Sequence, residues 1–141
     1  MDFERNKATM RRWFEEVWNQ GRVGAIDEML PAHGIVHGLG PDVHGPAEFK
    51  PFHATFRAAF PDMRIDLDEM IAEGDLVAAR WTATGTHRGD SLGFPATGQR
   101  AQFSGMVFGR FENGQIVEGW NNFDQLGLFT QLGAVTPPPA P

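Results

Sequence analysis

The stretch Arg80–Gly133 reads RWTATGTHRGDSLGFPATGQRAQFSGMVFGRFENGQIVEGWNNFDQLGLFTQLG, and it decides the fold class of this chain. Its long segments alternate apolar and polar side chains between glycine-rich turns, a pattern typical of β-strands. It predicts strands over Leu76–His87, Arg100–Phe111 and Gln115–Asn122, and then a short helix near Gln125–Leu132 that ends at Gly133. Because a sheet of this length twists, it cannot lie flat against helices everywhere, and a pocket is expected between them.

Upstream of this stretch, apolar residues recur at helical spacing. The pattern predicts helices over Asp2–Asn19, Val23–Leu30 and Ala47–Phe60, with a short strand at Ile35–His37 and a longer one from Met63 to Ile71. Helices followed by strands predict an α+β fold in which the N-terminal helices cover one side of a curved, mainly antiparallel sheet. We expect a single domain over residues 1–135 and a disordered proline-rich tail over residues 136–141.

Composition narrows the range of functions. The 141 residues carry a net charge of −6 without a cluster of Lys and Arg, which argues against a nucleic-acid partner. Apolar runs fall far short of the roughly 18 residues of a membrane span, so no membrane role is expected. Cysteine is absent, and no secretory signal is visible, which favours the cytoplasm. Tyrosine is absent as well, so a site must use other polar groups.

The five histidines raise the question of a metal site. His33 and His37 are four residues apart, but the glycines around them argue against a helix that would align their rings. Since no HExxH pattern or carboxylate cluster accompanies them, we expect no metal. Signatures of dinucleotide binding, P-loop phosphoryl transfer and serine hydrolysis are also missing, and no cofactor is expected.

A polar cluster lies at the end of the last predicted strand. Trp120, Asn122 and Asp124 share one face of the strand, and Asn121 lies on the other. Asp124 could act as a general base in a pocket, or it could cap the N-terminus of the final helix. Both interpretations fit its position.

Three further residues are candidates for catalysis. His87 ends a strand before a glycine-rich loop, and it could transfer protons or simply pack at the sheet edge. His37 leaves the same two possibilities open. Arg80 lies among apolar neighbours, so its guanidinium should meet a carboxylate or water, and Asp124 is the partner to test. Such a pair could be catalytic or structural.

The chain resembles the SnoaL-like polyketide cyclase family, within the nuclear-transport-factor-like superfamily, over all but its last residues. The matching segments are FEEVWNQG, FRAAFPD, AEGDLVAARWTATGTHRG, GFPATGQ, RFENGQIVEGW and FDQLGLFTQLG. The resemblance implies a cone-shaped α+β barrel with a deep apolar pocket, and ring closure without a cofactor. In the family's cyclases an aspartate near the last strand removes a proton from carbon; here Asn121 occupies that position, and Val107 stands near the family's histidine.

These observations support three hypotheses. In the first, Asp124 is the base of a metal-free cyclase or isomerase acting on a small apolar carbonyl compound, with Arg80 or His87 polarising its oxygen and His37 as a second donor. In the second, the chain only binds such a compound; in the third, Asp124, Arg80 and a water open an epoxide. The residues expected to contact the substrate are Trp120, Asn122, Asn121, Trp81, Phe108, Trp18 and Phe56. By analogy, a homodimer that covers the open face of the sheet is expected.

Overall fold

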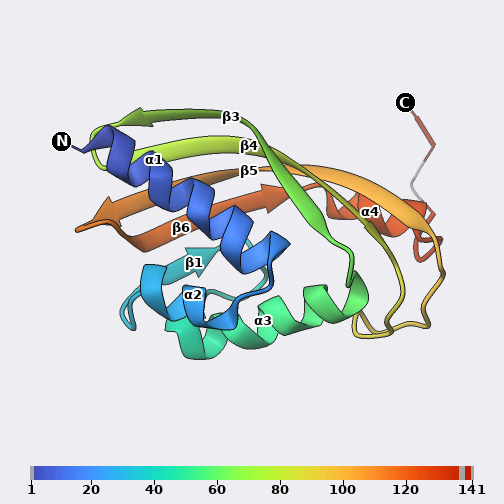
Figure 1. The fold of residues 1–141 in the computed structure, drawn as a ribbon. Helices are drawn as coiled ribbons and strands as arrows, with labels where there is room; N and C mark the ends of the chain where they lie inside the picture. The colour runs from blue at the N-terminus through green and yellow to red at the C-terminus, as the bar shows by residue number, and fades with distance from the viewer. Residues whose placement is uncertain (1, 137–138, 141) are drawn as a thin grey trace.

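Helices cover one side of a curved six-stranded sheet in the computed structural model of the chain, which describes residues 2–136 and 139–140 (Figure 1). The elements in chain order are α1 Phe3–Arg12, η1 Trp13–Asn19, α2 Val23–Met29, β1 Ile35–His37, β2 Val43–His44, α3 Gly45–Ala59, β3 Arg64–Glu73, β4 Leu76–Thr86, β5 Arg100–Glu112, β6 Gln115–Phe123 and α4 Gln125–Gln131. The predicted α+β class is confirmed. In the predicted tail, residues 137–138 and 141 lie outside the described residues.

The sheet has the strand order β2-β1-β6-β5-β4-β3 and is mixed. Every neighbouring pair is antiparallel except β1 and β6, which run parallel. Two bulges interrupt the ladder: Asp68 is the extra residue in β3, and Val117 is the extra residue in β6, opposite the step from Arg110 to Phe111 in β5. A bulge bends the strand that carries it and increases its twist, which accounts for part of the curvature visible in Figure 1.

The N-terminal helix begins as predicted, with the Asp2 carboxylate accepting a hydrogen bond from the Arg5 amide at 2.9 Å. The prediction of a uniform α-helix to Asn19 is wrong, because the turns widen at Trp13 into a π-helix. Its last turn ends with the Gln20 amide bonded to the Glu15 carbonyl, a spacing of five residues.

Side chains of α3 form hydrogen bonds with backbone carbonyl groups of η1. The buried His53 contacts the Val17 carbonyl through Nε2 at 2.6 Å, and Arg57 donates to the Trp18 carbonyl at 3.0 Å. Burial lowers the pKa of His53 and so favours the neutral ring, whose Nε2–H tautomer donates to this carbonyl. On the other side, the Asn19 amide exchanges two hydrogen bonds with the backbone of Ile65, which attaches η1 to β3.

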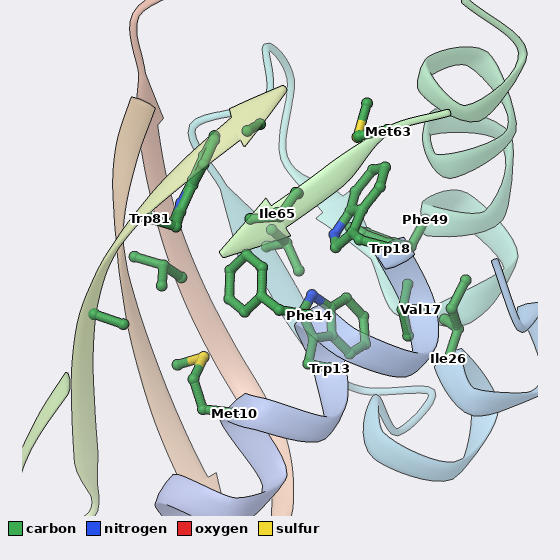
Figure 2. Close-up of a cluster of buried hydrophobic side chains, with 14 of the residues drawn as sticks. Met10, Trp13, Phe14, Val17, Trp18, Ile26, Phe49, Met63, Ile65 and Trp81 are labelled. Atoms are coloured by element: carbon green, nitrogen blue, oxygen red, sulfur yellow. The ribbon is translucent and has the colours of Figure 1, made fainter. Parts of the chain in front are cut away.

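The core lies between η1, α3 and the concave side of the sheet. Figure 2 shows Phe14 and Trp18 of η1 facing Trp81 of β4 and Ile65 of β3, with Phe49 of α3 behind them. Burying each such side chain stabilises the fold by about 1.5–3 kcal/mol. Helical spacing in the N-terminal segment and alternation in the strands predicted these faces correctly.

Two further features of the fold differ from the sequence-based expectations. The strand β2 was not predicted, and it pairs Val43 with Val36 of β1. The third helix begins at Gly45 rather than Ala47; as expected, it continues past Pro51, which removes one backbone donor without ending the helix. The remaining boundaries fall within one or two residues of those predicted.

Gly105 of β5 allows the ring of Trp81 to lie against the sheet. A Cβ atom at this position would lie 2.5 Å from Trp81 Cζ2 and 2.7 Å from the Asn122 carbonyl oxygen. We therefore expect Gly105→Ala to lower the free energy of unfolding by about 1–3 kcal/mol. Gly24 of α2 is the matched control, since a Cβ there meets nothing within 4 Å and alanine favours the helix by about 0.5–1 kcal/mol. Urea denaturation of both variants tests this; equal effects would contradict it.

Candidate functional site

An apolar pocket opens between the helices and the concave side of the sheet. Its space is about 400 Å³, including the part open to solvent. The described residues that line it are Phe14, Trp18, Leu39, Phe52, Phe56, Met63, Ile65, Trp81, Phe103, Asn121 and Phe123. Ten of these eleven side chains are hydrophobic, none is ionisable, and the eleventh is the amide of Asn121. Such a lining suits an uncharged molecule with a large apolar surface.

Trp81 supplies one of the two polar groups that are buried and unpaired among the described residues of this pocket. Its indole ring is 5% exposed and packs against Phe14, Phe103 and Phe123 at centroid distances of 6.3, 6.0 and 6.2 Å. The ring nitrogen Nε1 is buried and has no hydrogen-bond partner among the described residues. An unpaired buried donor costs about 1–3 kcal/mol, so this N–H group is a costly feature of the free protein.

Asn121 supplies the other polar group. Its Oδ1 atom is also buried, and within the described part of the chain no partner satisfies it. Gly38, with φ of +90°, lies directly on the backbone of Asn121, where a Cβ would approach the carbonyl oxygen to 1.8 Å. This close approach fixes the strand beside the loop that follows β1.

Asn121 and Val107, the positions to which the family resemblance assigns an aspartate and a histidine, lie opposite each other. Val107 of β5 pairs in register with Asn121 of β6. Both residues also border a second, mostly apolar pocket on the α1 side, whose space of about 380 Å³ includes the part open to solvent. An alkyl group and an amide therefore occupy the places where a histidine and a carboxylate were expected from the family resemblance.

The predicted contact residues divide between the two faces of the sheet. Trp18, Phe56, Trp81 and Asn121 line the pocket. Trp120, Asn122 and Phe108 do not, because they belong to the alternate set of side chains that points to the outer face. Phe108 pairs in register with Trp120, and it is 50% exposed.

Asp124 caps helix α4. Its Oδ1 atom accepts a hydrogen bond from the Gly127 amide at 2.9 Å, and the residue is exposed. It is not among the residues that line the apolar pocket. The capping alternative stated above thus describes its position, and its part in catalysis stays a prediction.

Arg80 lies on the outer face of the sheet and does not pair with Asp124. Its Nε atom is 2.6 Å from Glu69 Oε1, and Nη1 is 3.7 Å from Asp68 Oδ2. The expectation that this guanidinium meets a carboxylate was correct, but the predicted partner was wrong. The bulge in β3 brings Glu69 opposite Arg80, and alternation alone could not reveal it.

His87 is fully buried beside the loop that follows β4, outside the apolar pocket. Its Nδ1 atom accepts a hydrogen bond from the Thr97 amide at 3.1 Å, and its ring packs between Phe60 and Phe94. These contacts hold the loop against the core. No described residue satisfies its Nε2 atom.

His37 lies on the outer face of β1, between two carboxylates. Nδ1 is 2.9 Å from Asp42 Oδ1, and Nε2 is 2.7 Å from Glu118 Oε2. Both hydrogen bonds, that to Glu118 first, raise the pKa of His37. The four predicted catalytic residues are therefore not all brought together in one cavity, although Arg80 and Asp124 border the same polar pocket.

Sequence reasoning missed several pocket residues, namely Phe14, Leu39, Phe52, Met63, Ile65, Phe103 and Phe123. Alternation offered a signal for two of them, because Phe123 shares its face with Asn121 and Phe103 follows the parity of Val107. Leu39 offered none, since it stands alone in a glycine-rich segment.

Within residues 2–136 and 139–140, no three His, Asp or Glu side chains gather in a way that could hold a metal ion. No helix in the same part of the chain is long and apolar enough to cross a membrane.

The fold and the pocket define a class of α+β proteins in which helices close the concave side of a curved sheet over an apolar cavity. Within this class, the chain belongs to the SnoaL-like polyketide cyclase family, whose profile matches residues 8–132. The chain is 29% identical over 129 residues to the aklanonic acid methyl ester cyclase DnrD of Streptomyces peucetius, a match that covers 88% of each chain.

Solved structures show the same fold. AclR from Streptomyces galilaeus superimposes with a TM-score of 0.85 at 27% identity, covering 97% of this chain and 90% of that one. IdmH from Streptomyces antibioticus gives a TM-score of 0.79 at 27% identity, covering 91% of this chain and 98% of that one.

The capping contact of Asp124 predicts how substitutions there affect stability. Asp124→Ala removes the acceptor for the Gly127 amide, so the free energy of unfolding should fall by about 0.5–2 kcal/mol. Asp124→Asn keeps an acceptor oxygen and should retain most of the stability. Thermal or urea denaturation of the two variants measures this; equal loss in both would show that the charge, rather than the cap, matters.

Proposed function

We propose that this protein binds a small apolar carbonyl compound in the pocket and promotes its ring closure or isomerisation without a cofactor. Membership of the cyclase family and the name of the relative DnrD support this class of reaction. One observation carries the assignment of the site. Trp81 Nε1 and Asn121 Oδ1 are unpaired polar atoms in an otherwise hydrophobic lining.

These two groups complement an oxygen-bearing ligand. The indole N–H of Trp81 would donate to a carbonyl oxygen, where negative charge gathers when the compound enolises. The Asn121 oxygen would accept from a hydroxyl or enol group of the same molecule. The aromatic walls would hold a flexible chain in a folded conformation, which removes much of the entropic cost of ring formation.

A tryptophan or asparagine side chain cannot remove a proton from carbon at neutral pH, so the pocket provides binding, positioning and hydrogen bonding. In this proposal the proton that leaves carbon passes to the Asp124 carboxylate, which would have to leave the Gly127 amide that it caps at 2.9 Å. The epoxide-opening hypothesis needs Arg80 beside Asp124, whereas Arg80 is engaged by Glu69 and Asp68.

A second candidate function is binding without chemical conversion. It is favoured by the pair of positions across β5 and β6, where Val107 faces Asn121 and no acid–base group is present. Incubation with aklanonic acid methyl ester, the compound in the name of the relative DnrD, separates the two functions. Cyclised product supports catalysis, ligand recovered unchanged after binding supports sequestration, and absence of binding by this ester and by simpler aromatic ketones contradicts both.

Removal of either unpaired atom is predicted to weaken ligand binding while leaving the stability of the free protein nearly unchanged. Trp81→Phe keeps an aromatic ring but removes the N–H group, and Asn121→Leu removes the acceptor. Each should weaken binding of an aromatic ketone by roughly three- to ten-fold, the value of one neutral hydrogen bond. Neither should lower the stability of the free protein by more than about 1 kcal/mol, since an unsatisfied polar atom is removed in each case.

Isothermal titration calorimetry and denaturation measure the two quantities. Trp120→Phe is the matched control, because it makes the same change on the outer face of the sheet. Equal affinity in Trp81→Phe and wild type would contradict the role given to the indole.

We also propose that a second copy of the chain covers the outer face of the sheet. Ile71, Ala78, Phe108 and Trp120 form a row across β3, β4, β5 and β6, and Ile71 and Phe108 are 72% and 50% exposed. Ion pairs flank this row on both sides, with Arg80 and Glu69 on one and Arg110 and Asp75 on the other. Since each side carries both signs of charge, a second copy related by a two-fold axis would meet charges of either sign there.

Sedimentation velocity tests this pairing. Phe108→Glu places an unpaired charge in the middle of the apolar row and should convert the dimer to a monomer at micromolar concentration. Val23→Glu, at an exposed position on α2, is the control and should leave the dimer intact. A wild-type protein that sediments as a monomer would contradict the proposal.

A further inference from the structure

The loop between β1 and β2, residues 38–42, forms part of the pocket wall. Its Leu39 side chain lines the pocket with the aromatic residues of η1 and α3, and it is half-buried. The loop is attached at its start by Gly38, which lies on the Asn121 backbone. Leu39 is the only pocket-lining residue in the described chain that lies in a loop between strands.

His37 attaches the other end of this loop to the sheet. Its ring contacts Asp42, the last loop residue, on one side and Glu118 of β6 on the other, at 2.9 and 2.7 Å. The ring also stacks on Trp120 with the centroids 5.4 Å apart. The imidazole thus links the loop to a neighbouring strand through two polar contacts and one aromatic contact.

This geometry requires a protonated ring. A neutral imidazole has one donor and one acceptor nitrogen, so one lone pair would face a carboxylate. The imidazolium ion donates to both Asp42 and Glu118, and these bonds raise the pKa of His37. The other charged groups nearby are Arg110 of β5, 3.9 Å from Glu118 Oε1, and Asp75, which holds Arg110 at 3.1 Å.

We propose that Leu39 limits the size of the molecule that enters the pocket, and that His37 positions the loop carrying Leu39 through its bonds to Asp42 and Glu118. This inference rests on the proposed function of the pocket as a ligand site. It assigns His37 a positioning role on the outer face, since its ring does not line the cavity.

The positioning depends on pH, and the sign follows from the raised pKa of His37. Below the ordinary pKa of histidine, about 6.5, the ring is charged and both contacts are complete. As the pH rises through the elevated pKa of the folded state, the ring loses a proton, one contact becomes repulsive and the loop loosens. Burial shifts the pKa of His53 in the opposite direction, so a local measurement must separate the two.

A titration followed by nuclear magnetic resonance tests the positioning in the ligand-free protein. The Leu39 methyl signals, which lie beside aromatic rings, should shift with the same midpoint as the His37 ring signals. In Asp42→Ala the loop loses its partner, and the methyl signals should no longer follow the ring. Glu118→Ala is the matched control, in which both midpoints should fall together because the loop contact remains.

Methyl signals that ignore His37 in the wild-type protein, or that still follow it in Asp42→Ala, would overturn the positioning role. His33→Gln, an exposed histidine, should leave both titrations unchanged. A change there would show that the signals report general charge effects, and it would also count against the proposal.

Binding of two ketones tests the size limit. The affinities of 1-acetylnaphthalene and 9-acetylanthracene are measured by calorimetry at pH 6. Leu39→Ala should raise the affinity for the three-ring ketone relative to the two-ring ketone by about ten-fold. Leu126→Ala, at an exposed position of α4 that does not line the pocket, should leave the ratio unchanged.

The outcomes distinguish this inference from the function on which it rests. Binding of both ketones with the same ratio in wild type and Leu39→Ala would overturn the size limit and leave the proposed function intact. Binding of neither ketone to any variant would overturn the proposed function and the size limit together. The titration would still decide the positioning role of His37.

Discussion

The attachment of η1 to its two neighbours is the constraint on which the pocket depends. A π-helical turn leaves backbone carbonyls without their usual partners, and buried carbonyls of this kind must be satisfied. His53 and Arg57 of α3 meet the carbonyls of Val17 and Trp18, and Asn19 meets the backbone of Ile65. These contacts fix η1 between a helix and a strand. They place its aromatic side chains opposite the sheet at a distance that leaves an open space.

The sheet contributes the polar part of this space. Trp81 can lie against Gly105 because glycine has no side chain that would collide with its ring. The backbone of Asn121 is in close contact with Gly38. The residues Trp81 and Asn121 thus carry a buried donor and a buried acceptor that are unpaired within the described chain. Under the proposed function, such a pair favours ligands that carry matching oxygen atoms and disfavours simple hydrocarbons, which would leave both polar atoms unpaired.

Local patterns in the sequence were sufficient for most of the fold and for part of the site. Helical spacing predicted the buried faces of α1 and α3, and alternation predicted β3 to β6. The parallel pairing of β1 with β6 joins segments about 80 residues apart, which no local pattern reveals. The partner of Arg80 depends on a bulge, and the pocket position of Leu39 depends on a loop without periodicity. The position of Asp124 fitted both a general base and a helix cap, and its hydrogen bond from the Gly127 amide is that of a helix cap.

The alternation along β6 has a consequence for how the family can change over time. Odd-numbered residues such as Asn121 and Phe123 serve the cavity, whereas even-numbered Trp120 belongs to the opposite surface. Gain or loss of a single amino acid within the strand would exchange the two sets and abolish both surfaces together. The irregular register next to the β5–β6 turn, between Arg110 and Phe111, offers a place where such a length change can be absorbed. Natural variation in length is therefore expected to gather at that turn, while the strand beyond it evolves by substitution alone.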